Sequence, residues 1–257
     1  MIYLGYLVVA LAGLGAGVVV NALADRIAGD EEPPWAAGYC RKCGKPLPAA
    51  RFFPLLNLRA DRRRCASCGS VASLRRPLIE LALAITYPLL LAHLLAPESA
   101  GHVSPWLTFV VDGVLCAVLA FTFVVDLEHH LIYDIAIYPP ALLLVGVALL
   151  FDHKALAGIL FGIVLYGGLF LLLYGLGFLL YRTEALGLGD VKLAALIGML
   201  AGWPGVITAI VLATLFGTAF SLIVLGISEA NSKSYIPYGT AMSLGAVLTL
   251  LMTHPLW

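Results

Sequence analysis

Apolar runs of about 20 residues recur along the chain, and each is long enough for a helix to cross the hydrocarbon core of a bilayer. Only 12% of the 257 residues are charged and the mean hydropathy is +0.99, whereas about a quarter of the residues of a soluble domain are charged. The sequence therefore predicts an all-α polytopic membrane protein.

The apolar runs predict about eight helical segments. They cover residues 3–24, 78–96, 105–125, 135–151, 155–181, 191–202, 206–227 and 238–254. In the first segment, Gly13 and Gly17 have the spacing that lets a second helix pack closely. The segment 191–202 is too short to span, because it rises only about 18 Å against about 30 Å of hydrocarbon. Either it is a half-span, or 191–227 folds differently around the interruption at Trp203-Pro204-Gly205.

The basic residues define the expected orientation in the lipid bilayer. Eleven of the fifteen Lys and Arg residues lie between Arg26 and Arg76, which is typical of a cytoplasmic loop. Arg182 and Lys233 fall on the same side, and only Lys154 falls outside. We therefore expect the N-terminus outside. A basic cluster can also bind nucleic acid, but we recognise no aromatic stacking platform in this loop and expect no nucleic-acid partner.

The basic loop carries a cysteine pattern typical of a metal site. Two Cys-x-x-Cys pairs supply four thiols, at Cys40, Cys43, Cys65 and Cys68. Four thiolates satisfy tetrahedral zinc, and in a reducing compartment such pairs favour a metal over disulfides. Gly44 and Gly69 directly follow the pairs, where a metal knuckle requires positive φ. We predict a small zinc-ribbon-like loop whose ion is structural.

Two aspartates stand where apolar segments begin or end. Asp190 follows Gly187-x-Gly189, where a helix N-cap belongs, and Asp126 ends the third segment. The expected topology brings both to the cytoplasmic face. Two carboxylates can hydrolyse a peptide bond, one ionised as the base and one protonated to polarise the carbonyl. We predict Asp126 and Asp190 as catalytic residues, with Gly187, Gly189 and Lys192 at the approach of the substrate backbone.

The two aspartates differ in the helix end that each occupies. Because Asp190 begins a helix and Asp126 ends one, the macrodipoles favour a charge on Asp190. We expect Asp126 to hold the proton that the pair shares. A plain helix cap is one alternative role for Asp190. A transporter or scaffold with a zinc-clipped loop is another function for the chain, but transport carboxylates lie near the bilayer midplane and these lie at helix ends.

The chain resembles the type IV prepilin peptidases, membrane aspartyl proteases with a Gly-x-Gly-Asp motif. The matching features cover nearly the whole chain: Gly187 to Lys192, Asp126 followed by Asp134, the two Cys-x-x-Cys pairs, Arg75 to Glu80, Pro54-Leu55-Leu56 and Pro237-Tyr238-Gly239. The resemblance implies a bacterial inner-membrane enzyme that cleaves the basic leader of prepilins or pseudopilins at the cytoplasmic face. It also implies methylation of the new N-terminus from S-adenosylmethionine, catalysis by Asp126 and Asp190, and metal ligation by the four cysteines.

We expect three parts in the chain. Residues 1–24 form the first transmembrane helix, residues 25–77 the cytoplasmic zinc-binding loop with the methyltransferase part, and residues 78–257 the transmembrane aspartyl peptidase domain. The loop is the only sizeable polar module available to hold the methyl donor. Arg76 and Glu80, at its edge, are therefore the candidate donor-binding residues.

Three positions depart from the pattern of the family that the chain resembles. Tyr133 replaces a usual Pro before Asp134, and Thr240 replaces a usual Pro after Pro237-Tyr238-Gly239. The first helix has Ala16-Gly17-Val18-Val19 where Gly-Ser-Phe-Leu is common, which bears on the methyltransferase part. None of the three is expected to touch the aspartates or the thiolates.

Overall fold

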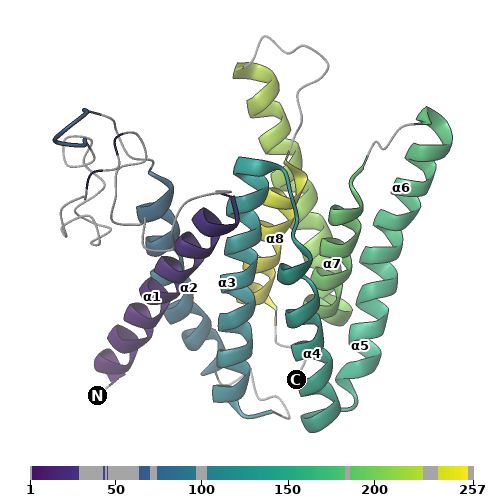
Figure 1. The fold of residues 1–257 in the computed structure, drawn as a ribbon. Coiled ribbons are helices and arrows are strands. Elements are labelled where there is room, and N and C mark those ends of the chain that lie inside the picture. The colour runs from purple at the N-terminus through teal and green to yellow at the C-terminus, as the bar shows by residue number, and fades with distance from the viewer. Residues whose placement is uncertain are drawn as a thin grey trace. The chain divides into compact units, whose positions relative to one another are not determined.

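The structure is a computed structural model, and the all-α prediction is confirmed. It describes residues 2–28, 43, 45, 64–69, 74–96, 103–182, 186–227 and 237–253. The regular elements in these ranges are helices (Figure 1). The chain divides into two compact units, Met1–Leu91 and Ala92–Trp257, and each is described by itself.

The first unit is built on helix α1 (Ile2–Ala28) and on most of helix α2 (Arg75–Leu94). A Cβ atom on Gly17 would lie 2.6 Å from Glu80 Cα, and one on Gly13 would overlap the Leu83 carbonyl. The close approach predicted from the glycine spacing is therefore confirmed. Larger residues at these positions would push the two helices apart.

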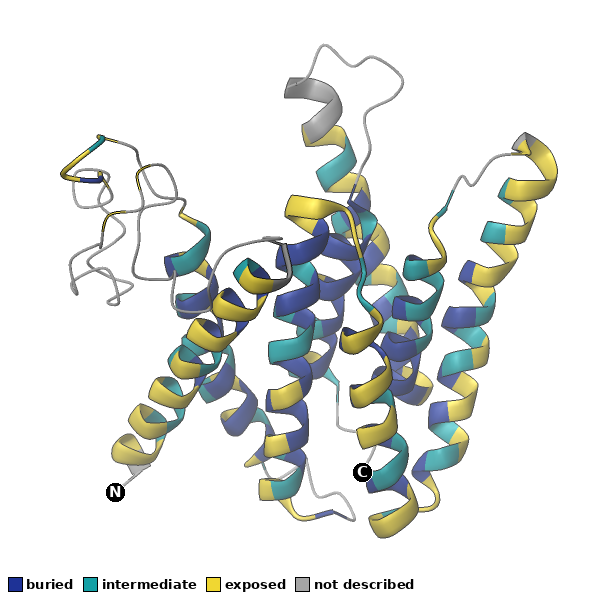
Figure 2. Ribbon diagram, viewed as in Figure 1, coloured by how far each residue is buried: buried dark blue, intermediate teal, exposed yellow. Residues whose placement is uncertain are grey.

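The second unit contains the remaining elements. They are α3 (Pro105–His129), η4 (Asp134–Ala136), α4 (Tyr138–Phe151), α5 (Ala155–Gly162), the π-helical η5 (Ile163–Gly167), α6 (Gly168–Tyr181), α7 (Leu188–Ile227) and α8 (Tyr238–Met252). Helix α8 packs against both α7 and α3, and α5 with η5 packs against α7. Buried residues gather on α3, α7 and α8, whereas α6 is largely exposed (Figure 2).

Helix α7 is bent where the sequence interrupts the apolar run. Its backbone leaves the helical region at Gly202 (φ 50°) and Trp203, just before Pro204. Positive φ costs glycine little, and proline offers no amide to the preceding turn. The predicted segments 191–202 and 206–227 are thus two parts of one bent element.

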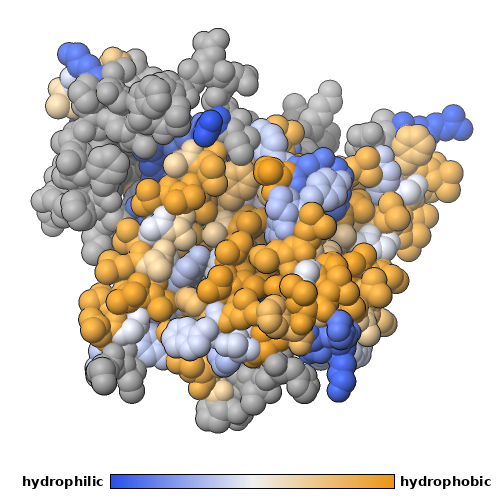
Figure 3. Space-filling view, turned by 60° about the horizontal axis from the view of Figure 1, so that its bottom comes forward, coloured by the Kyte–Doolittle hydropathy of each residue, from blue (hydrophilic) through white to orange (hydrophobic). Residues whose placement is uncertain are grey.

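Long apolar helices and their exposed faces make this a multi-pass membrane protein. Six helices in the described ranges are long and apolar enough to span a membrane, and Tyr238–Met252 is a shorter apolar helix. Large apolar side chains such as Leu142, Leu150 and Leu179 are more than 70% exposed, and the coloured residues on the face shown in Figure 3 are mostly hydrophobic. In a bilayer such faces meet lipid. The number of eight spans stays a prediction.

Candidate aspartate site and metal centre

The last turn of α3 positions Asp126. The helix ends at His130, whose backbone is left-handed (φ 55°) and whose amide donates a hydrogen bond of 3.0 Å to the Asp126 carbonyl. This is the usual way for a chain to leave a helix abruptly. The Asp126 side chain is only 1% exposed, so α3 ends on a buried carboxyl group.

The first turn of α7 positions Asp190. The helix begins at Leu188, so Gly187, not Asp190, takes the N-cap position, and the predicted cap at Asp190 is wrong. The Asp190 carboxylate bends back instead. Its Oδ2 atom would lie 3.5 Å from a Cβ atom on Gly187, and the Gly187 amide donates a hydrogen bond to the carboxylate. An acid at the third helical position bonded to the N-cap amide is half of a capping box, and this arrangement buries Asp190 to 6% exposure.

The first turn of α8 forms hydrogen bonds with the Asp126 side chain. The backbone N–H of Thr240 donates a hydrogen bond of 2.6 Å to Asp126 Oδ2, and the Thr240 hydroxyl donates a second one of 2.9 Å to the same oxygen. The N–H groups of the first helical turn have no partner within their own helix, so a carboxylate is a natural acceptor. A Cβ atom on Gly239 would lie 3.0 Å from Asp126 Cγ, so any larger residue there would crowd the carboxylate. The expectation that the departure at Thr240 does not touch the aspartates is wrong.

Ile132 joins the starts of α7 and α8. Cβ atoms on Gly189 and Gly239 would each lie 3.1 Å from Ile132 atoms. The Asp126 and Asp190 carboxylates are close enough to interact electrostatically. The structure therefore brings the two predicted aspartates into one site where α3, α7 and α8 meet. It also shows that the bare backbone of Gly189 already faces a side chain of this chain, whereas Gly187 is exposed.

Lys192 lies beside this site, on the exposed side of α7. Its Nζ atom forms an ion pair of 2.6 Å with Asp134 Oδ1 and lies 5.7 Å from the centre of the Tyr138 ring. Both members of the ion pair are substantially exposed to solvent, so the pair contributes little stability. The ion pair links η4 to α7. The role of Lys192 toward a substrate stays a prediction.

Tyr166 is a residue near the site that the sequence analysis missed. It lies on the π-helical turn η5, is 1% exposed and interacts electrostatically with Asp190 and Tyr238. Its ring packs edge-on against Phe170 at 5.3 Å between centroids. The hydroxyl has no hydrogen-bond partner in the described part of the chain. Single π-helical turns are frequent at functional sites, but nothing in an apolar run of sequence distinguishes one.

Three cysteines of the first unit converge as a metal site requires. The sulfur atoms of Cys43, Cys65 and Cys68 lie within 4.8 Å of one another, with Cys43 and Cys65 3.7 Å apart. Zinc–sulfur bonds of about 2.3 Å in a tetrahedron place two sulfurs about 3.8 Å apart. Gly69 has φ +69° and donates its amide to the Cys65 carbonyl at 2.9 Å, so the predicted knuckle is confirmed there. These thiols can hold a metal ion; Cys40 and Gly44 lie outside the described residues.

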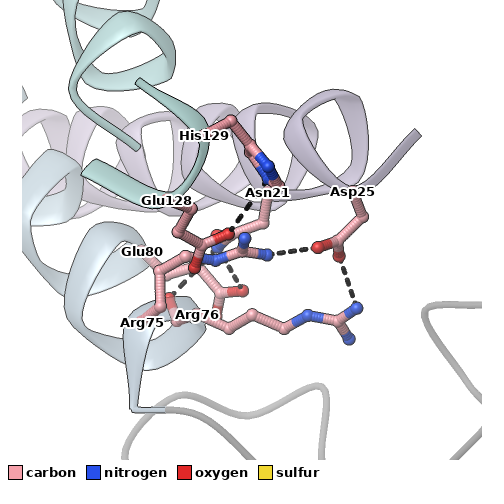
Figure 4. Close-up of polar contacts among 7 residues, drawn as sticks. All are labelled: Asn21, Asp25, Arg75, Arg76, Glu80, Glu128 and His129. Atoms are coloured by element: carbon pink, nitrogen blue, oxygen red, sulfur yellow. Dashed lines mark hydrogen bonds and ion pairs between the residues drawn. The ribbon is translucent and has the colours of Figure 1, made fainter. Parts of the chain in front are cut away.

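The α1–α2 polar cluster, defined here as Asn21, Asp25, Arg75, Arg76 and Glu80, lies in the first unit (Figure 4). Asn21 Nδ2 donates to the Arg76 carbonyl at 3.1 Å and to Glu80 Oε1 at 3.3 Å. Arg75 and Arg76 each form an ion pair with one oxygen of Asp25. The Asn21 Oδ1 atom is buried and has no partner among the described residues. The two candidate donor-binding residues, Arg76 and Glu80, are therefore linked through Asn21.

The fold and site together define a helical multi-pass membrane protein with a buried pair of aspartates. The model of the type IV leader peptidase family matches residues 113–222, and the model of the bacterial peptidase A24 N-terminal domain matches residues 11–94. No solved structure matches the chain.

Curated relatives agree with both family models. The prepilin leader peptidase/N-methyltransferase of Aeromonas hydrophila is 30% identical over 233 residues, which cover 87% of this chain and 75% of that protein. The protein of the same name from Pseudomonas aeruginosa is 28% identical over 220 residues, covering 82% and 70%. The type 4 prepilin-like proteins leader peptide-processing enzyme of Escherichia coli is 28% identical over 221 residues, covering 83% and 75%. The chain belongs to the type IV leader peptidase family.

Proposed function

We propose that this protein is an aspartyl endopeptidase that cleaves the basic leader of prepilin-like proteins, with Asp126 and Asp190 as its catalytic residues. The main support for the proposal is that two buried carboxylates, one from α3 and one from α7, lie in one site. Two adjacent carboxylates do not readily both ionise, so such a pair shares a proton at neutral pH. One member can then activate water while the other polarises the scissile carbonyl.

The substrate approaches this pair from the ends of the helices. Gly187 is exposed beside Asp190, so an extended leader can lie against bare backbone there, with Lys192 nearby; Gly189 lets the start of α7 pack on Ile132. The basic residues of the chain favour the cytoplasmic side for this face, with the N-terminus outside. The names of the relatives support prepilins or prepilin-like proteins, such as pseudopilins, as substrates. The apolar helices and the family support a bacterial inner membrane as the location.

A cleavage assay in membranes tests the peptidase. The substrate is a precursor whose basic leader ends in Gly before an apolar helix. Membranes containing the wild-type chain should convert the precursor to the mature form, and membranes containing Asp126→Asn or Asp190→Asn should not. Cleavage by either variant at the wild-type rate contradicts the proposal.

A second activity, methylation of the new N-terminus, is supported by the relatives named as N-methyltransferases. We assign it to residues 25–77 with the start of α2, place the peptidase in residues 78–257, and treat 1–24 as the first transmembrane helix. Zinc on Cys43, Cys65 and Cys68, with Cys40 as the fourth ligand, would order this region. Bound S-adenosylmethionine supplies the methyl group.

The α1–α2 polar cluster offers the acceptor oxygens that a cationic group requires. Glu80 is buried to 8% exposure, and Asn21 Oδ1 is a buried acceptor with no partner in the described ranges. Buried acceptors of this kind need a donor or a positive charge. We therefore assign Glu80 and Arg76 to the binding of the donor, whose sulfonium is a cation, or of the amine that it methylates.

A further inference from the structure

Hydrogen bonding distinguishes the two carboxylates of the site. Asp126 Oδ2 accepts both the N–H and the O–H of Thr240, at 2.6 and 2.9 Å. Hydrogen bonds to a charged acceptor are about twice as strong as those between neutral groups. Both bonds therefore stabilise Asp126 in its ionised form. Among the described residues, the corresponding donor to the Asp190 carboxylate is the Gly187 amide.

Helix ends oppose this difference only in part. Asp126 lies in the last turn of α3, whose macrodipole disfavours a negative charge, but Thr240 lies in the first turn of α8. The N-terminus of α8 therefore points at the same carboxylate and favours the charge. Asp190 lies at the N-terminus of α7 alone. Both aspartates therefore face a helix N-terminus, and the C-terminus of α3 still disfavours a charge on Asp126. A helix-end effect of this kind is smaller than a hydrogen bond to a charged acceptor, so the Thr240 hydroxyl decides between the two aspartates.

We propose that Thr240 is a positioning residue that holds Asp126 as the ionised member of the pair, so that Asp126 is the base and Asp190 carries the shared proton. The inference rests on the proposed peptidase activity and assigns the roles within it. It reverses the assignment expected from the ends of α3 and α7 alone, because that argument did not include α8.

The assignment gives each proton a path. Water forms a bond to the scissile carbonyl carbon while Asp126 takes one water proton and Asp190 donates its proton to the carbonyl oxygen. The carbon–nitrogen bond of the resulting gem-diol then breaks. Asp126 passes its proton to the leaving amine, and a hydroxyl of the gem-diol returns a proton to Asp190. The pair thus ends in its starting state.

Other ionisable groups face the pair from the neighbouring elements. His130, at the C-cap of α3, acts on Asp126, as Asp190 does from α7. Tyr166 on η5 and Tyr238 on α8 face Asp190. None of these side chains changes in a substitution of Thr240, so a change in pH dependence reports on the two hydrogen bonds. Proline, which the resemblance leads one to expect at position 240, offers neither an N–H nor an O–H.

Three substitutions of Thr240 separate its two donors. Thr240→Val removes the hydroxyl at nearly constant shape, Thr240→Pro removes both donors, and Thr240→Ser keeps both. We measure kcat and KM for cleavage of the precursor between pH 5 and 9 in detergent-solubilised full-length protein. The matched control is Thr249→Val on the same helix, since the Thr249 hydroxyl donates only to the Gly245 carbonyl, at 2.8 Å.

Because the base must be ionised, loss of a donor should move the acid limb of the kcat profile to higher pH. We expect kcat at pH 7 to fall about tenfold in Thr240→Val and further in Thr240→Pro, as for the loss of hydrogen bonds to a charged group. KM should stay unchanged, because Thr240 is buried against Asp126. Thr240→Ser and Thr249→Val should stay within about twofold of wild type.

Results that contradict the role of Thr240 differ from results that contradict the peptidase activity. An unmoved acid limb in Thr240→Val overturns the inference, as does an equal loss of kcat in Thr240→Ser. Thr240→Val decides the matter even where Thr240→Pro does not insert into the membrane. Failure of the wild-type chain to cleave contradicts the proposed peptidase itself, whereas cleavage lost in Asp190→Asn but unchanged in Thr240→Val contradicts only the role of Thr240.

Discussion

The aspartate site and the α1–α2 polar cluster both bury charged groups, but they do so in opposite ways. In the cluster, Asp25 pairs with two arginines, so opposite charges offset their loss of hydration. In the aspartate site, two carboxylates lie together, supported by hydrogen bonds and by His130. Breaking a largely buried ion pair destabilises a protein, whereas two adjacent carboxylates repel each other whenever both are ionised.

This contrast distinguishes charged groups that stabilise the protein from charged groups that serve its activity. Opposite charges on α1 and α2 hold the two helices in register. A pair of like charges gives no such benefit, and groups whose protonation is perturbed in this way cluster at functional sites. We therefore expect substitutions in the aspartate site to remove an activity without loss of stability, and substitutions in the first unit to affect metal, order and methylation together.

Asp190→Asn should produce the largest effect and is the most direct test of this contrast. We expect cleavage to fall at least about 1,000-fold, because the members of a catalytic pair act as a unit. The melting temperature should be nearly unchanged, since asparagine is close in shape to the protonated Asp190 and, like it, carries no charge. Gel analysis of the precursor and a thermal melt measure the two effects. A melting temperature several degrees lower would show that the pair is structural.

The same variant should keep the other activity. Given a substrate that is already cleaved, Asp190→Asn should still transfer a methyl group, because that reaction needs no carboxylate pair. Mass spectrometry of the N-terminus measures it. Absence of the extra methyl group from the wild-type product would show that the chain is a peptidase only.

The double change Cys43→Ser, Cys65→Ser should have the next largest effect, in the first unit. Two of the converging thiols are removed, so the metal ion should be lost and the methylated fraction of the product should fall about tenfold or more. Cleavage should survive at least in part, since the aspartates lie on other helices. Elemental analysis and mass spectrometry check both results. Complete loss of cleavage in a correctly inserted variant would link the metal to proteolysis.

Glu80→Gln tests the α1–α2 polar cluster more finely. The amide keeps the shape of the side chain and its contact with Asn21 but removes the charge. We expect methyl transfer to fall about tenfold, the range for losing one charge-assisted bond, with metal content and cleavage unchanged. Methylation at the wild-type rate would exclude Glu80 from the donor or amine site.

Gly239→Ala should have the smallest of these effects on the aspartate site. The added Cβ would lie 3.0 Å from Asp126 Cγ, so the carboxylate must shift by a few tenths of an ångström, and a small misplacement in a catalytic site costs rate. We expect cleavage to fall about threefold to tenfold. Gly146→Ala on α4 is the matched control, because nothing lies within 4 Å of its added Cβ. Equal rates in the two variants would contradict the close fit.

Local patterns in the sequence were sufficient to predict much of this protein. Hydropathy and length predict the membrane helices, because each run must match the bilayer by itself. The interruption at Trp203-Pro204-Gly205 indicates where the helical run is disturbed, although it left a half-span and another fold of 191–227 both open. The glycine after Cys68 predicts a left-handed backbone. Both depend on the chemistry of a few adjacent residues. Asp126 and Asp190 were recognisable because each lies at the end of an apolar run.

The tertiary structure alone decided how these aspartates are held. Thr240 reaches Asp126 across 114 positions of sequence, and Ile132 lies against the glycines that begin α7 and α8. Tyr166 comes to face Asp190 through the packing of η5 on α7. No short pattern encodes such contacts, because they depend on which helix ends meet when the apolar faces pack. The sequence by itself therefore determined which groups can react, and the packing of α3, α7 and α8 decided which of them bears the charge.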